Sequence, residues 1–193
     1  MSEPPRVVAL CGSLRDESHT RTALEAALAA AADRGARTEL IDLRDLDLPV
    51  YDADVGDAGD VADLTEPVRE ADAVLLGTPM YHGSYSSPLK TALDYCGFDE
   101  FEDTTVGMLA VSGGSFPITA LDHLRTVCRA LDAWVLPTQA AVPNAAETIE
   151  DGEFLDPDIA ERVAVVGTRA VEYANIEPDP ACFASEENVG ALD

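Results

Sequence analysis

The sequence predicts an α/β fold in which a five-stranded parallel sheet, of strand order 2-1-3-4-5, lies between helices on both faces. Five short apolar or β-branched segments alternate along the chain with five helical segments. Such alternation requires parallel strands joined by right-handed crossovers, and therefore a sheet covered on both sides. The chain has 193 residues, 47% of them hydrophobic, which suits one such three-layer domain with a substantial core.

The strands are expected where short runs of apolar residues carry β-branched side chains. The first run, "RVVALC", stops at Gly12, and "RTELID" alternates between apolar and polar residues. The third and fourth runs, "DAVLLGT" and "TTVGMLAVS", are almost continuously apolar, as buried parallel strands are. The five expected strands are residues 6–11, 37–42, 72–78, 104–112 and 134–142.

The helices are expected in the longer segments between the strands. The alanine-rich run that follows the first strand has Gly35 as its stop. Pro88 falls in the first turn of a later helix, where the missing N–H does no harm. The expected helices are residues 20–35, 61–71 (with Pro67 near a break), 86–97, 118–133 and 157–175. Residues 1–175 then form one domain, and 176–193 an acidic, loosely ordered C-terminal tail.

The charge balance excludes some partners. Twelve Lys and Arg residues stand against 37 Asp and Glu residues, a formal charge of −25, so nucleic acid and anionic membrane surfaces would be repelled. Lys90 is the only lysine, and we expect it to pair with Asp94 one helical turn on. Acid-rich, lysine-poor composition favours adaptation to high salt, which screens self-repulsion; a mesophilic protein that is simply acidic is the alternative.

The cysteines predict neither a metal site nor an oxidising compartment. Cys11, Cys96, Cys128 and Cys182 are far apart and form no CxxC pair, so no zinc or iron–sulfur site is expected. No signal-peptide pattern and no apolar run near ~20 residues is visible. The expected location is the cytoplasm.

The loop after the first strand looks like an anion site. Ligands of such sheets bind beyond the carboxyl ends of the strands, where the strand order reverses. In "GSLRDESHT", residues 12–20, Ser13, Ser18 and Thr20 supply hydroxyls, Arg15 supplies a charged fork, and free N–H groups precede a helix. This donor-rich loop suits a terminal phosphate. A bridging pyrophosphate or the loop of a nucleotide hydrolase is not expected, because the GxGxxG and GxxxxGK[ST] spacings are missing. A capping loop that binds nothing is the alternative.

Two further loops fall at the same edge of the predicted sheet. "TPMYHGSYSSP", residues 78–88, predicts a rigid turn that exposes backbone N–H groups and an aromatic ring, although Tyr81 could instead be a half-buried core residue. "SGGSFP", residues 112–117, has successive glycines that let backbone approach a flat ligand, although it could be a simple tight turn. Convergence of the three loops favours a ligand site.

These motifs resemble the NADPH-dependent FMN reductase family, whose fold is flavodoxin-like. "GSLRDESHT", "TPMYHGSYSSPLKTALDY" and "VSGGS" match its GSxRxxS, PxYxxxxPxxLKxxxD and SxGG-type motifs in order, and "DLRDLDLPVYDAD" is similar to its loop after the second strand. The resemblance covers roughly residues 6–172. It departs at His82, where asparagine is usual, and at Thr20, where asparagine is frequent.

The resemblance implies non-covalently bound FMN. The phosphate would be held by Ser13, Arg15, Ser18 and Thr20. The ring and ribityl chain would be lined by Pro79, Met80, Tyr81, His82, Gly83 and Ser84. The other side would be closed by Ser112, Gly113 and Gly114. No residue is assigned a catalytic role, because the cofactor carries the chemistry.

The implied activity is hydride transfer from NADPH or NADH through FMN to a quinone, free flavin or similar small acceptor. A flavodoxin-like electron carrier for protein partners is the alternative, and a flavin-binding module without turnover is a third reading. The resemblance also implies a homodimer or homotetramer. Outside the motifs, His19 and His123 are expected as surface or cap residues, and Trp134 as the start of a core strand or a subunit contact.

Overall fold

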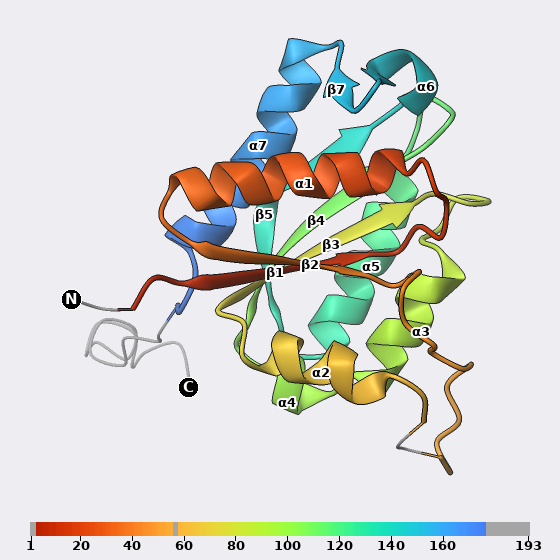
Figure 1. The fold of residues 1–193 in the computed structure, drawn as a ribbon, viewed down its shortest axis with the longest axis vertical. Coiled ribbons are helices and arrows are strands. Elements are labelled where there is room, and N and C mark those ends of the chain that lie inside the picture. Colours follow the sequence, from red (N-terminus) through yellow and green to blue (C-terminus); the bar gives the residue numbers. More distant parts are fainter. Residues whose placement is uncertain (1–2, 56–57, 177–193) are drawn as a thin grey trace, which may run out of the picture.

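The central sheet confirms the predicted strand order. The computed structural model of the protein describes residues 3–55 and 58–176. Its sheet has the order β2-β1-β3-β4-β5, and each neighbouring pair is parallel. The strands are β1 (Arg6–Cys11), β2 (Arg37–Asp42), β3 (Ala73–Pro79), β4 (Thr105–Val111) and β5 (Trp134–Val142). Their carboxyl ends meet at one edge of the sheet, at the right of Figure 1.

The five expected helices are present, with ends within a few residues of those predicted. They are α1 (His19–Asp33), α2 (Val61–Arg69), α3 (Ser87–Tyr95), α5 (Ile118–Ala130) and α7 (Pro157–Glu172). Pro67 does not break α2 where it stands, because the helix runs two residues further before it ends. Ser86 caps α3 and Asp156 caps α7 through their side chains, which satisfies backbone donors that a helix start leaves free.

Four short elements were not predicted. They are α4 (Phe98–Phe101), α6 (Ala145–Thr148) and the antiparallel pair β6 (Ile149–Glu150) and β7 (Glu153–Phe154). Each is four residues long or fewer, which is too short for hydrophobic periodicity to show. Helix α6 begins three residues after the carboxyl end of β5.

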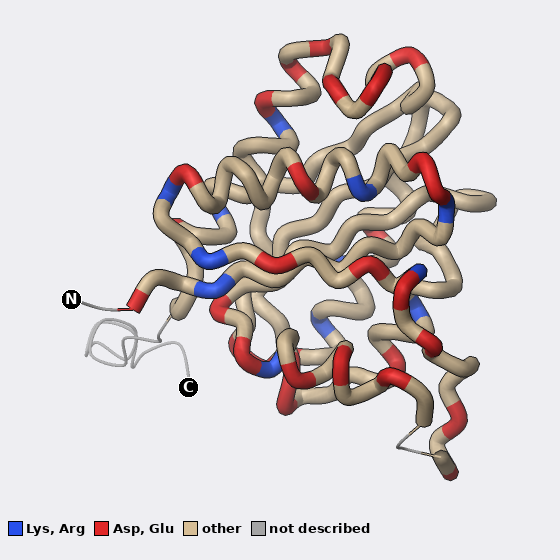
Figure 2. Tube along the Cα trace, viewed as in Figure 1, with Lys and Arg blue, Asp and Glu red and all other residues tan. Residues whose placement is uncertain are grey.

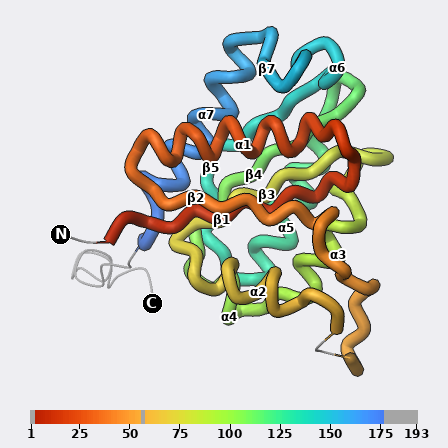
Figure 3. The backbone as a smooth tube through the Cα atoms, in the orientation of Figure 1, coloured from red at the N-terminus to blue at the C-terminus, as the bar shows by residue number. Residues whose placement is uncertain are grey.

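The helices form two layers around the sheet. Helices α1 and α7 cover one face, and α2, α3 and α5 cover the other (Figures 1 and 3). Two separate clusters of buried side chains result, one including Leu24 and Val166 and the other including Leu64 and Leu121. Helices α1 and α7 touch closely, since a Cβ added at Gly167 would lie 1.8 Å from the carbonyl oxygen of Ala27.

Asp and Glu residues are spread along the whole described part of the trace, as Figure 2 shows. Lys90 makes the predicted ion pair with Asp94, one turn along α3. Trp134 begins β5, where its indole Nε1 donates a hydrogen bond to Asp103 and its ring is half-exposed. None of the helices in the described ranges has the length and apolar character needed to cross a membrane. The predicted acidic tail lies, from residue 177, outside the described residues.

Candidate functional site

A pocket at the carboxyl edge of the sheet brings the three predicted loops together. It has a volume of about 150 Å³. Eight of the predicted site residues line it, namely Ser13, Arg15, Thr20, Pro79, Met80, Tyr81, Ser112 and Gly113. They come from the ends of β1, β3 and β4 and from the first turn of α1. The expectation that parallel strand ends would gather these loops is therefore correct.

The loop after β1 presents unused hydrogen-bond donors. Ser13 and Thr20 are each only 2% exposed. Ser13 Oγ accepts a hydrogen bond from the Arg15 N–H at 3.4 Å, which leaves its own hydroxyl hydrogen to donate. The hydrogen bonds among the described residues do not use the backbone N–H groups of Asp16 or Glu17. Together with the N-terminus of α1, these donors have the chemistry that an anion requires.

Ser18 does not line the pocket but caps the helix beside it. Its side chain accepts a hydrogen bond from the Arg21 N–H at 3.1 Å, and its backbone is extended, as at most helix N-caps. The structure thus gives Ser18 a direct role in starting α1. The cap uses the hydroxyl oxygen as an acceptor and does not use the hydroxyl hydrogen.

The loop after β3 forms a two-residue hairpin over residues 81–84. The Tyr81 N–H donates to the Ser84 carbonyl at 3.0 Å, and the Ser84 N–H donates back to Tyr81 at 3.1 Å. His82 and Gly83 have positive φ values of 51° and 81°, as both central residues of a type I′ turn must. Tyr81 is 52% exposed, so it is not a core residue.

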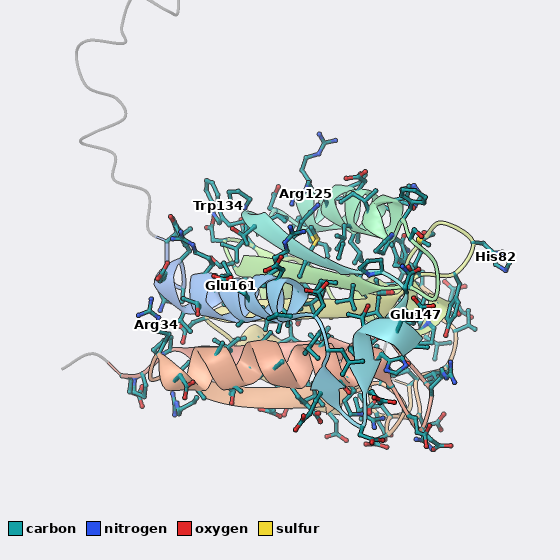
Figure 4. The ribbon with its side chains drawn as sticks, turned by 90° about the horizontal axis from the view of Figure 1, so that it is seen from above. Arg34, His82, Arg125, Trp134, Glu147 and Glu161 are labelled. Carbon is teal, nitrogen blue, oxygen red and sulfur yellow. The ribbon has the colours of Figure 1, made fainter. Side chains whose placement is uncertain are left out.

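The hairpin directs His82 away from the pocket. In Figure 4 its imidazole points outward at the tip of the loop. His82, Gly83 and Ser84 do not line the pocket, so their predicted contact with a flavin ring is not prepared by this geometry. The turn also explains the departure from the family motif, because asparagine and histidine are both enriched among non-glycine residues at positive φ.

Helix α5 supports the same hairpin. His123 Nδ1 lies 3.0 Å from Ser84 Oγ, and Thr119 Oγ1 lies 3.6 Å from the sulfur of Met80. His123 is exposed, as predicted for a surface residue. Its contact with the hairpin was not predicted, because the two residues are 39 positions apart.

The loop after β4 closes the other side of the pocket. Ser112 is buried, and its hydroxyl donates to the carbonyl of Gly114. A Cβ added at Gly113 or Gly114 would meet no protein atom within 4 Å. Packing within the chain therefore does not require glycine at either position. Open backbone of this kind admits a flat ligand at short range.

Five pocket residues were not predicted. They are Glu17, His19, Val111, Ala145 and Ala146. The two alanines belong to α6, which is held at the pocket by a hydrogen bond from the Ala145 N–H to the Ser112 carbonyl at 2.9 Å. Glu17 and His19 lie within the loop of residues 12–20. Their place in this loop was enough to predict that they line the pocket.

The described cysteines are not equipped for redox or metal chemistry. Burial raises the pKa of the Cys11 thiol, and it raises the pKa values of Cys96 and Cys128 to about 12. The three thiols are therefore protonated at neutral pH, which makes them poor nucleophiles. Within residues 3–55 and 58–176, no three His, Cys, Asp or Glu side chains are grouped so that they could hold a metal ion.

Comparisons with known proteins agree with this geometry. Residues 5–147 match the family model described as NADPH-dependent FMN reductase. The chain is 32% identical over 154 residues to an FMN-dependent NADPH-azoreductase of Staphylococcus saprophyticus, covering 75% of this chain and 81% of the relative. It is 38% identical over 119 residues to the enzyme of the same description from Staphylococcus aureus, covering 60% and 63%.

Solved structures share the fold at lower identity. An NADH:FMN oxidoreductase in its apo form superposes with a TM-score of 0.73 at 22% identity, covering 93% of this chain and all of that one. A flavoenzyme NAD(P)H:(acceptor) oxidoreductase from Paracoccus denitrificans gives 0.72 at 23% identity, covering 88% and 97%. The motifs, the sheet order and the family match agree, and the chain belongs to the NADPH-dependent FMN reductase family.

Proposed function

We propose that this protein binds FMN at the three-loop pocket and passes hydride from NADPH or NADH to a small aromatic acceptor of the azo or quinone class. Membership of the family supports FMN as cofactor and a reduced nicotinamide as donor. The azo class is supported by the sequence relatives, which are named as azoreductases. The observation that carries the proposal is that one pocket is lined both by Glu17, whose backbone N–H is unused among the described residues, and by Gly113, whose backbone is open.

The residues present fit FMN by the chemistry of their donors. A terminal phosphate needs several hydrogen bonds and a counter-charge, and the loop offers free N–H groups, the hydroxyls of Ser13 and Thr20, and Arg15. A planar ring needs close, flat walls, and Tyr81 and the backbone at Gly113 supply them. The protein's own work is to bind the phosphate, orient the ring and cover one side of it. When bound, FMN supplies the hydride chemistry.

The size of the pocket supports the proposed assembly. Pockets that bury most of a drug-sized ligand measure about 300–1,000 Å³, whereas this one measures about 150 Å³. A pocket of this volume encloses only part of a flavin, which leaves room for nicotinamide, acceptor or a second subunit to contact the cofactor. We propose a homodimer or homotetramer in which the subunit boundary lies near the flavin, which light scattering in molar salt would test.

The remaining proposals concern the chain as a whole. Residues 1–175 form a single flavodoxin-like FMN-binding domain, residues 176–193 form an acidic tail, and the protein works in the cytoplasm. Its formal charge of −25 supports adaptation to high salt, because the Debye length falls to ~3 Å at 1 M. The melting temperature then rises steadily with KCl into the molar range. A melting temperature that does not respond to KCl would contradict this adaptation.

The decisive experiment for the activity is steady-state oxidation of NADPH with an azo dye or a quinone as acceptor. Wild-type protein reconstituted with FMN turns over, whereas Arg15→Ala needs more FMN to reach the same rate. A flavodoxin-like electron carrier, the less favoured alternative, would bind FMN yet fail to oxidise NADPH with any small acceptor.

A further inference from the structure

Arg21 connects the end of β2 to the loop that follows β1. It lies in the first turn of α1, and its side chain is 26% exposed. Its Nε donates to Asp42 Oδ2 at 2.7 Å, and one terminal nitrogen lies 2.6 Å from the same oxygen. Asp42 ends β2, its side chain is 9% exposed, and its other oxygen accepts the Arg44 N–H at 3.2 Å. The guanidinium is therefore fixed at the base of the loop.

The same guanidinium binds two carbonyl groups of the loop. Its terminal nitrogens donate to the Asp16 carbonyl at 3.1 Å and to the Arg15 carbonyl at 3.4 Å. In a trans peptide the C=O and the following N–H point in opposite directions. Holding these two carbonyls toward Arg21 therefore turns the N–H groups of Asp16 and Glu17 away from it. These are the N–H groups that no hydrogen bond among the described residues uses.

We propose that Arg21, anchored by Asp42, is a positioning residue for the terminal phosphate of the flavin. It is not among the residues that line the pocket, and its guanidinium is already bonded to Asp42 and to the two loop carbonyls. It holds two carbonyl oxygens, which would repel a phosphate, on its own side of the loop and leaves the matching N–H groups on the opposite side, where Glu17 lines the pocket. This inference rests on the proposed FMN site and extends it to residues that no motif marked.

The arrangement separates loop orientation from helix and sheet stability. Helix α1 keeps its own N-cap at Ser18. The loop keeps a second anchor, the ion pair between Arg44 and Asp16. Loss of Arg21 therefore frees the two peptide units to rotate while the sheet and α1 remain. The loss of Arg21 therefore weakens binding of a ligand that carries a phosphate and does not change binding of a flavin without one.

The test compares FMN with riboflavin, which has the same ring and ribityl chain but no phosphate. Dissociation constants for both are measured by fluorescence titration of the apoprotein, for wild type, Arg21→Met, Arg21→Lys and Asp42→Asn. Arg34→Met is the matched control, since Arg34 pairs with Glu172 on the surface at the far end of α1. Circular dichroism melting of each variant reports on the fold.

Arg21→Met weakens FMN about tenfold, the loss of roughly one charged hydrogen bond, and leaves riboflavin unchanged. Arg21→Lys and Asp42→Asn also raise the ratio of the FMN dissociation constant to the riboflavin dissociation constant. Lysine cannot bind Asp42 and both carbonyls together, and Asp42→Asn removes the charged anchor of Arg21. Arg34→Met leaves the ratio at the wild-type value. If Arg21→Met fails to fold, the ratio of the two dissociation constants in Arg21→Lys tests the proposal instead.

Two results would overturn the inference. An unchanged ratio in Arg21→Lys and Asp42→Asn removes Arg21 from phosphate positioning. Equal weakening of FMN and riboflavin means that Arg21 supports only the fold. Failure of the wild-type protein to prefer FMN over riboflavin is a different outcome, since it contradicts the proposed phosphate site itself.

Discussion

His123 of helix α5 and Ser84 of the hairpin after β3 are in direct contact, with Nδ1 of the imidazole 3.0 Å from the serine Oγ. The ring of Tyr85 meets the same imidazole edge-on, with the ring centroids 6.5 Å apart. Through these contacts α5 holds the hairpin whose first residue, Tyr81, lines the pocket. The wall of the pocket that contains Tyr81 is thus supported by a residue 39 positions further along the chain than Ser84.

The first prediction follows from that support. His123→Ala removes one exposed hydrogen bond, a loss of about 0.5–1.5 kcal/mol. The change loosens the hairpin at residues 81–84 and leaves the loop at residues 12–18 in place. FMN and riboflavin are therefore weakened by the same factor, about two- to tenfold. Fluorescence titration with both ligands measures the effect. A loss confined to FMN would place His123 at the phosphate instead.

The second prediction concerns the positive φ at His82. His82→Asn keeps the turn, because asparagine tolerates the left-handed region, and leaves the melting temperature and the affinity for FMN unchanged. His82→Val destabilises the turn by about 1–2 kcal/mol, because a β-branched residue is strained there. Urea unfolding compares the two variants. Strong loss of FMN in His82→Asn would show that the outward-pointing imidazole reaches the flavin after all.

The third prediction uses a pair of glycines. Gly167→Ala forces α1 and α7 apart, since the new Cβ would lie 1.8 Å from the Ala27 carbonyl, and costs about 1–3 kcal/mol of stability. Gly113→Ala meets no protein atom within 4 Å. It leaves stability unchanged but weakens both FMN and riboflavin. Thermal melts and ligand titrations on both variants distinguish a glycine needed for packing from one that faces a ligand. If Gly167→Ala and Gly113→Ala lowered the melting temperature equally, this distinction would be refuted.

The fourth prediction concerns alkaline pH. Burial raises the pKa values of Cys96 and Cys128 from 9.0 to about 12 in the folded protein. Above about pH 9 the unfolded chain loses these protons while the folded one keeps them, so the free energy of unfolding falls by about 1.4 kcal/mol per pH unit for each thiol.

Urea unfolding of wild type and of a Cys96→Ala, Cys128→Ala double variant checks this effect at about pH 8 and about pH 10. The stability advantage of wild type over the variant shrinks as the pH rises, because the variant lacks the two titrating groups. Lysine and tyrosine titration affects both proteins alike and cancels in the comparison. An advantage that does not change with pH would contradict the assigned burial of the thiols.

The sequence was sufficient for the fold and for most of the pocket. Alternation of strands and helices requires a parallel sheet, and five strands in a chain of this length favour the observed order. The parallel strands then bring Ser13, Tyr81 and Gly113 to one edge. That inference needed only the position of each motif at the end of a strand. The ion pair of Lys90 with Asp94 was equally accessible, since helical spacing alone brings the two side chains together.

Other features depended on geometry that no local pattern encodes. The direction of His82 is set by two consecutive positive φ values in a turn. The contact of Arg21 with Asp42 joins residues 21 positions apart and exists because β2 ends beside β1. Helix α6 supplies Ala145 and Ala146 to the pocket, yet it has only four residues and no periodic signal.

We expect FMN bound at the three-loop pocket to accept hydride from NADPH or NADH and to be reoxidised by a small acceptor. Anaerobic mixing of the FMN-loaded protein with NADPH, followed by addition of a quinone or azo dye, tests this route in one spectrophotometric trace. The visible flavin absorbance should be lost fully on adding NADPH and should recover fully on adding the acceptor. Tightly bound FMN whose absorbance does not change with either nicotinamide would contradict this hydride route.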